Sequence, residues 1–323
     1  MDSAAKETPK EVLMPLGQRA LVDTCFEEGH YESGIAVLDK LRSPKYYPSP
    51  SHVRQLIYIA LYPPPLENAQ TPDDLTSGSP KKLNIQRQKT HLLPTPESSV
   101  NALSLLCALL HTNSPAALAK GLPSYVTSKG GVRFSGVREE QDDREDAFIG
   151  KQSADIRQAK DCWAILADGF VKRSDSEDVA EQPPTEDEMD VDEEEDENTA
   201  RRVVGKHAWG VLEWLVGLFE LDEKVAESKG MPRRSDILLS QIPLARAGLQ
   251  WDIQSALNVV FDALTPLPLA RHDGNGIPSA TPPILEQYRT GLGTRLMALV
   301  RTYSLFLIST FMAQVYYSPT TQS

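Results

Sequence analysis

The segment CFEEGHYESGIAVLDKLRSP, residues 25–44, predicts two short helices that fold back on each other at Gly29. The second helix should present Tyr31, Ile35 and Leu38 on one face, because they recur at helical spacing. We expect this face to pack on the apolar residues that precede the turn, which are Leu13, Leu16, Ala20 and Cys25. A two-helix unit still leaves an outer face to cover, and the helix that begins near Ser51 can supply that cover.

The same spacing predicts further helices along the chain. They fall at about residues 53–61, 95–113, 159–170, 204–219 and 253–264, with one or two more from Ile284 onward. The helix in 95–113 is apolar nearly all round, so we expect it to lie deep in the core. Strand signals are confined to residues 130–137. The sequence therefore predicts an all-α fold, an irregular helical bundle or a short α-solenoid with long disordered loops.

Composition suggests how the chain is organised. Residues 1–126 should hold N-terminal helical hairpins with a disordered loop at about 63–92, followed by a polar linker at 127–152. A helix at 153–172 should pack on the core, and an acidic disordered tract should cover 173–200. A C-terminal helical region at 201–317 and a tail at 318–323 complete this division.

The distribution of charge and the number of cysteines limit the kinds of function that the sequence suggests. Residues 174–200 hold fourteen Asp and Glu residues and no Lys or Arg, and without them the net charge of −12 becomes about +2. The rest of the chain is thus nearly neutral, which argues against a nucleic-acid partner. Three widely spaced cysteines, Cys25, Cys107 and Cys162, are typical of buried free thiols in a reducing compartment.

Neither end of the sequence has the pattern of a targeting or spanning segment. The first residues lack the apolar stretch of a signal peptide. The apolar run TYSLFLISTFMAQVYY, residues 302–317, has 16 residues, fewer than the roughly 20 that a membrane span needs. A buried last helix is therefore favoured, and a C-terminal membrane anchor remains an alternative.

Residues 20–44 resemble a single tetratricopeptide hairpin. Leu21 stands at an apolar position of the first helix, Gly29 and Tyr31 form a Gly-x-Tyr turn, and Leu38 stands at a large position of the second helix. Gly34 replaces the small Ala of that family, and no second copy follows at a spacing of 34 residues. The resemblance implies one helical hairpin that stacks with neighbouring helices.

One stretch suggests an enzyme. DDRED, with Asp142, Asp143 and Asp146, fits the DDxxD pattern of isoprenoid synthases, in which carboxylates one helical turn apart hold Mg²⁺ and a diphosphate. The stretch has no apolar face and no second metal motif, so a solvated run of charges is the favoured interpretation. No other catalytic or metal-binding spacing is evident in the sequence, and we expect no cofactor.

The polar segments also contain short regulatory motifs. SPKK at Ser79 matches a proline-directed kinase site, and LLPTPESS, residues 92–99, resembles a phosphodegron read by F-box ubiquitin ligases once Thr95 and Ser99 carry phosphate. Thr95 followed by Pro96 equally predicts the start of a helix. Ser174 and Thr185 precede acidic residues, as acidophilic kinases require. The candidate interaction and regulatory residues are Tyr31, Leu38, Ser79, Thr95, Ser99, Ser174 and Thr185.

These features predict a non-catalytic helical scaffold or adaptor subunit of an intracellular multiprotein complex, regulated by phosphorylation in its loops. Its expected partners are proteins, and the acidic tract suits basic proteins such as histones, which favours the nucleus over the cytoplasm. Two alternatives stay open. They are a Mg²⁺-dependent isoprenoid-diphosphate enzyme that uses Asp142, Asp143 and Asp146, and a membrane adaptor anchored by residues 302–317.

Overall fold

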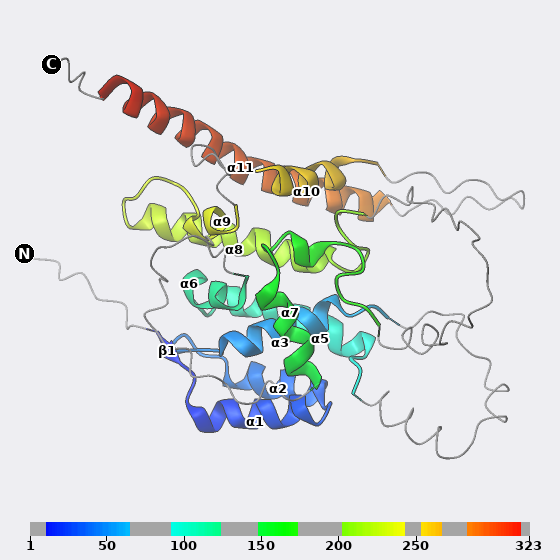
Figure 1. Cartoon of the computed structure of the whole chain (residues 1–323). Coiled ribbons are helices and arrows are strands. Elements are labelled where there is room, and N and C mark those ends of the chain that lie inside the picture. Colours follow the sequence, from blue (N-terminus) through cyan, green and yellow to red (C-terminus); the bar gives the residue numbers. More distant parts are fainter. Residues whose placement is uncertain are drawn as a thin grey trace, which may run out of the picture.

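The computed structural model describes residues 11–64, 92–123, 148–173, 202–242, 253–266 and 283–317, with side chains of the last range described as far as Thr302. Within these ranges helices dominate (Figure 1). The strands there are two residues long, β1 (Val12–Leu13) and β2 (Tyr46–Tyr47), and they pair in parallel. The expected all-α class is confirmed. The expected loops at 63–92 and 173–200, most of the polar linker and the strand signal at 130–137 lie outside the described residues.

The opening stretch forms the expected hairpin. Helices α1 (Leu16–Glu27) and α2 (Tyr31–Leu41) are joined by a tight turn in which Gly29 has φ 78°, a left-handed value that suits glycine. The buried face of α1 differs from the prediction. Val22 and Phe26 are fully buried, whereas Leu16 is 66% exposed.

Gly34 explains this rotation of α1. A Cβ atom at residue 34 would lie 2.5 Å from Cε1 of Phe26, so the glycine leaves room for the aromatic ring between the two helices. With Phe26 turned toward α2, Val22 one turn earlier follows it into the core, and Leu16 is left outside. The large aromatic residue thus sets the face of the helix.

Helix α3 (Pro50–Leu61) is the most deeply buried element described. Every residue from His52 to the C-cap Tyr62 is buried. The helix begins at Ser49, whose hydroxyl oxygen accepts a hydrogen bond from the backbone N–H of His52 at 3.2 Å, and Pro50 occupies the first helical position. It packs between α5 (Pro96–Leu110) and α7 (Phe148–Gln158), and also against α8 (Trp209–Ser228).

The helix expected to lie deep in the core at 95–113 does so on one face only. Ala102, Leu105, Leu106 and Leu109 of α5 are buried, whereas Val100 is 67% exposed. The second face of the first hairpin is covered by α5, which packs on α2, and by α3, the helix that begins near Ser51, whose buried His52 contacts Asp23 and Phe26 of α1. Periodicity shows which face of a helix is apolar but not which partner meets it, because that depends on long-range topology.

The segment 159–173 is not the continuous helix expected for 153–172. Asp161 takes over the backbone donors that a helix would use, because its Oδ1 accepts from the N–H of Trp163 at 3.0 Å and of Ala164 at 2.9 Å. The chain then makes a single 3₁₀ turn, η3 (Ala164–Leu166). Cys162, Trp163 and Leu166, which the helical spacing marked as apolar, are nevertheless buried, and so is Ile165, whereas Ala159 and Phe170 are half-buried.

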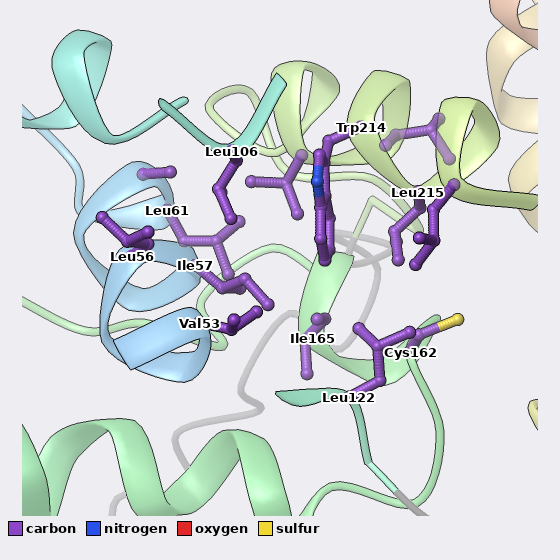
Figure 2. Close-up of a cluster of buried hydrophobic side chains, with 14 of the residues drawn as sticks. Val53, Leu56, Ile57, Leu61, Leu106, Leu122, Cys162, Ile165, Trp214 and Leu215 are labelled. Carbon is purple, nitrogen blue, oxygen red and sulfur yellow. The ribbon is translucent and has the colours of Figure 1, made fainter. Parts of the chain in front are cut away.

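Helix α8 joins the two ends of the chain in one hydrophobic core. It packs on α3, on α5 and on the short helix α6 (Pro115–Leu118), and its other side carries α11 (Pro283–Tyr317) and α9 (Asp236–Ser240). Trp214 of α8 is fully buried, and Figure 2 shows its indole between the aliphatic side chains of α3 and Leu215. Helix α10 (Gln254–Leu264) packs along α11 at the far edge from α1 (Figure 1).

The close contact at Gly34 gives a first prediction. Gly34→Ala should lower the free energy of unfolding by about 1–2 kcal/mol, because overpacking against Phe26 outweighs the gain in helix propensity. Chemical denaturation of the purified variants measures this. Gly17→Ala in α1 is the matched control, since a Cβ there meets nothing within 4 Å and stability should be unchanged or higher. A Gly34→Ala protein as stable as wild type would contradict the tight helix contact.

Candidate interaction surfaces

Two of the residues predicted to mediate interactions are part of the core. Tyr31 is 3% exposed and Leu38 is 1% exposed. The hydroxyl of Tyr31 donates a hydrogen bond to the carbonyl oxygen of Leu92 at 2.5 Å, which attaches α2 to the segment before α5. Burial, with a smaller contribution from Tyr62, raises the pKa of the Tyr31 phenol well above its ordinary value. These side chains shape the hairpin and do not present themselves to a partner in this conformation.

Thr95 and Ser99 lie at the start of α5. The Thr95 hydroxyl oxygen accepts from the N–H of Ser98 at 3.0 Å, so the prediction of a helix start at Thr95 and Pro96 is confirmed. The same hydroxyl donates to Oε1 of Glu32 at 2.6 Å, and the Ser99 hydroxyl donates to the Thr95 carbonyl oxygen at 3.2 Å. Both residues keep an accessible side, so a regulatory role for them stays a prediction.

The other predicted site residues lie outside the described residues. They are Ser79, Asp142, Asp143, Asp146, Ser174 and Thr185. Within the part of the chain that the structure describes, no three His, Cys, Asp or Glu side chains come together as metal ligands would. No helix in that part combines the length and apolarity of a membrane span.

The three cysteines are free thiols. Cys162 is completely buried, and Cys25 and Cys107 are half-buried. Burial raises the pKa of Cys162 and, together with the nearby Glu213 carboxylate, that of Cys107. Both therefore stay in the unreactive thiol form at neutral pH, as structural cysteines do.

Most of the exposed large apolar residues that the structure describes belong to two parts of the fold on opposite sides of the core, and Val100 and Met231 lie elsewhere. One region, the α1 surface, comprises Val12, Leu16 and Leu21, which are 44–66% exposed. The other, the α10–α11 end, comprises Phe261, Leu264, Ile284 and Leu285, which are 38–76% exposed. Figure 1 shows that α10 ends and α11 begins at the same end of this helix pair, with α8 and the central helices between it and α1.

The α10–α11 end exists because α10 is apolar on two faces. Its small residues face the core, with Ala256, Val259, Val260 and Ala263 all buried. At Gly293 of α11 a Cβ atom would lie 2.9 Å from Cβ of Ala263, so the two helices approach closely on this small-residue face. The larger Phe261, which its helical spacing would place with the core residues, is 55% exposed, and Leu264 is 39% exposed although its side chain lies against Gly293 of α11. The sequence missed this because both faces satisfy the helical spacing.

Arg289 fixes α10 and α11 to the rest of the fold. Its guanidinium is buried and stacks on the ring of Trp209 with its carbon 4.5 Å from the ring centre. Nη2 donates to the carbonyl oxygen of Asp262 at 2.5 Å and lies 3.5 Å from Oδ1 of the same residue. The Asp262 carboxylate also accepts from the N–H of Val204 at 2.9 Å. One arginine therefore connects α11, α10 and the start of α8.

Two polar contacts along α8 complete the attachment. Arg295 donates two hydrogen bonds of 2.8 Å to Glu220, and Tyr288 donates one of 2.7 Å to Glu213. The hydrogen bond from Arg295 lowers the pKa of the Glu220 carboxyl, in spite of its partial burial. A shallow depression follows the solvent side of α11 between Glu286 and Arg295. The exposed apolar end thus sits on a helix pair whose position is set before any partner arrives.

No family model, no curated protein and no solved structure matches this chain. The resemblance of residues 20–44 to a tetratricopeptide hairpin therefore stays a prediction. What can be inferred about function comes from the surfaces and contacts of the fold itself.

The Glu220–Arg295 pair gives a prediction with a defined pH dependence. Glu220→Gln should reduce the free energy of unfolding at pH 7 by no more than about 1 kcal/mol, because the pair is partly exposed to solvent. A depressed pKa stabilises the fold above the ordinary glutamate value of 4.5, and this contribution is lost as the pH falls through the folded-state pKa. The difference between wild type and variant should therefore shrink in acid.

Denaturation curves between pH 3 and pH 7 test this dependence. Glu286→Gln, at an exposed carboxyl on α11, the helix that carries Arg295, serves as the control and should show a smaller difference at neutral pH. If Glu220→Gln lowers the free energy of unfolding by the same amount at pH 3 and at pH 7, an ionic contribution from this pair is contradicted.

Proposed function

We propose that the protein is a non-catalytic helical scaffold or adaptor subunit that binds a partner protein through the α10–α11 end. The observation that supports this proposal is the exposure of Phe261, Leu264, Ile284 and Leu285 on two firmly attached helices, near the end where α10 stops and α11 begins (Figure 1). Exposed apolar surface costs solubility, and proteins keep large patches of it mostly where something binds.

The physical character of the α10–α11 end suits a protein partner. A helix that is apolar on two faces is stable in water when both faces are covered, and the fold covers one of them. Phe261 offers an aromatic side chain, and aromatic residues are enriched at protein interfaces. Because Arg289 and Arg295 already hold the helices in place, little ordering entropy is lost on binding.

The α1 surface supports the adaptor role. It lies on the opposite side of the core, so two partners are able to bind without competing for space (Figure 1). This is the outer side of the hairpin whose sequence resembles a protein-interaction repeat. Binding of basic proteins such as histones by the acidic tract, a nuclear location, and phosphorylation at Ser79, Ser174 and Thr185 belong to the same proposal and are supported by sequence composition.

Substitution of Phe261 tests the proposed docking site. In affinity purification of the tagged full chain from its own cells, wild type should recover at least one protein in near-stoichiometric amount. Phe261→Asp should reduce that recovery by about tenfold or more, as expected when an aromatic anchor of an interface is lost. Mass spectrometry with isotope-labelled reference peptides measures the ratio.

The control is Val100→Asp, which places the same charge at an isolated exposed apolar residue of α5. Both variants should melt close to wild type, since both side chains are mostly exposed. A wild-type chain that elutes alone as a monomer from extract, or a Phe261→Asp chain that retains every partner, would rule out this docking site.

A further inference from the structure

Residues 92–95 are held against the first turn of α2 by two side-chain contacts. Tyr31 donates from its hydroxyl to the carbonyl oxygen of Leu92 at 2.5 Å, and Thr95 donates from its hydroxyl to Oε1 of Glu32 at 2.6 Å. Between them, Pro94 is buried and Leu93 packs against the core. The Tyr31 contact is partly buried, whereas the Thr95–Glu32 contact is exposed to solvent.

The exposed contact depends on a single hydrogen. The Thr95 hydroxyl donates its one proton to the Glu32 carboxylate while its oxygen accepts from the N–H of Ser98. Any group that replaces this proton removes the donor, and a negative group turns the attraction to Glu32 into repulsion. Glu97, in the first turn of α5, is a second acidic residue two positions along the chain from Thr95.

The local backbone suits a kinase that recognises a hydroxyl residue before proline. Thr95 is exposed, is followed by Pro96, and has φ −84° and ψ 161°, so the acceptor lies in extended chain just outside the helix. Ser49 provides a contrast within the same protein. It also precedes a proline and also caps a helix, but it is 3% exposed. Sequence alone does not separate the two positions, whereas burial does.

We propose that Thr95 is a phosphoacceptor for a proline-directed protein kinase, and that phosphate on Thr95 detaches residues 92–95 from α2. In this transfer the Thr95 oxygen forms a bond to the γ-phosphorus of a nucleoside triphosphate as the bond to the bridging oxygen breaks. The hydroxyl proton passes to the base of the kinase, and the nucleoside diphosphate leaves. No oxidation or reduction takes part.

The effect on α2 is distinct from the effect on α5. A phosphothreonine carries a charge of about −1.5 to −2 at pH 7, so it is repelled by Glu32 across the former hydrogen bond. At the start of α5 the same charge meets the positive end of the helix dipole and a ready N–H donor at Ser98, so α5 remains capped. The modification thus weakens the contact between the helices while leaving each helix formed.

Release of this segment uncovers apolar surface, because Leu93 leaves its place against the core and Tyr31 loses its acceptor on Leu92. The inference goes beyond docking at the α10–α11 end. It concerns a different edge of the fold, and its measurements do not require a partner protein.

The test compares four full-length proteins, which are wild type and Glu32→Gln, each with either threonine or genetically encoded phosphothreonine at position 95. Phosphate should lower the melting temperature of the wild-type chain by about 2–4 °C and that of Glu32→Gln by less than about half as much. Hydrogen exchange in residues 92–95 should accelerate on phosphorylation, with little change in the second half of α5.

A second measurement addresses access to the hydroxyl. Folded full-length protein treated with ATP and a proline-directed kinase should carry phosphate at Thr95 and at least tenfold less at Ser49, as measured by mass spectrometry. An unmodified Thr95 in the folded chain would overturn the proposal. So would a melting-temperature change that is equal in wild type and Glu32→Gln, because repulsion from Glu32 would then have no part in it.

Discussion

The burial of α3 on all sides from His52 onward is the constraint on which the rest of the structure depends. A helix with every residue from His52 to Tyr62 out of solvent must be covered on all sides, so α5, α7 and α8 are drawn around it from three separate parts of the chain. Packing against α3 is close at the 3₁₀ turn Ala119–Gly121, where a Cβ at Gly121 would lie 2.6 Å from the side chain of Val53. The buried His52 ring contacts the Asp23 carboxylate with an N–O separation of 2.7 Å and attaches α1.

Irregular backbone around this centre is stabilised by side chains that satisfy its polar groups. The side-chain oxygen of Gln241 accepts from the backbone N–H of Cys162 at 2.9 Å, and the side-chain nitrogen donates to the carbonyl oxygen of Pro123 at 2.8 Å. The backbone carbonyl oxygen of Gln241 accepts from the indole N–H of Trp163 at 3.2 Å. Unpaired, such buried groups would each cost about 1–3 kcal/mol. The outer helices α10 and α11 are attached differently, by a few specific contacts centred on Arg289. The exposed apolar residues at the α10–α11 end therefore take no part in packing the core around α3.

The sequence predicted local features well where one residue controls the geometry. Gly29 placed the first turn, and Thr95 with Pro96 placed a helix start, because a turn or a cap depends on residues within four positions. Prediction was poorer where packing between helices decides which face of a helix is buried. The rotation of α1 follows from the space left by Gly34 for Phe26, and the exposure of Phe261 follows from close contact at Gly293. Both depend on a second helix whose position periodicity does not give.

The same distinction applies to the candidate sites. Tyr31 and Leu38 were chosen for their place in a repeat-like pattern, and that pattern reports on packing, so both are core residues. The Thr95–Glu32 contact joins two helices through residues far apart in sequence, and no local motif contains it.

The central claim, that one core surrounds α3 and includes helices from both sides of the acidic tract, is tested most directly by native-state hydrogen exchange at increasing denaturant. If α3, α5 and α8 form one cooperative unit, their slowest amides should exchange with the same free energy and the same denaturant dependence, equal to those of global unfolding. If the slowest amides of α8 exchange through a separate opening with a lower free energy than those of α3, the chain contains two independent units and the account is contradicted.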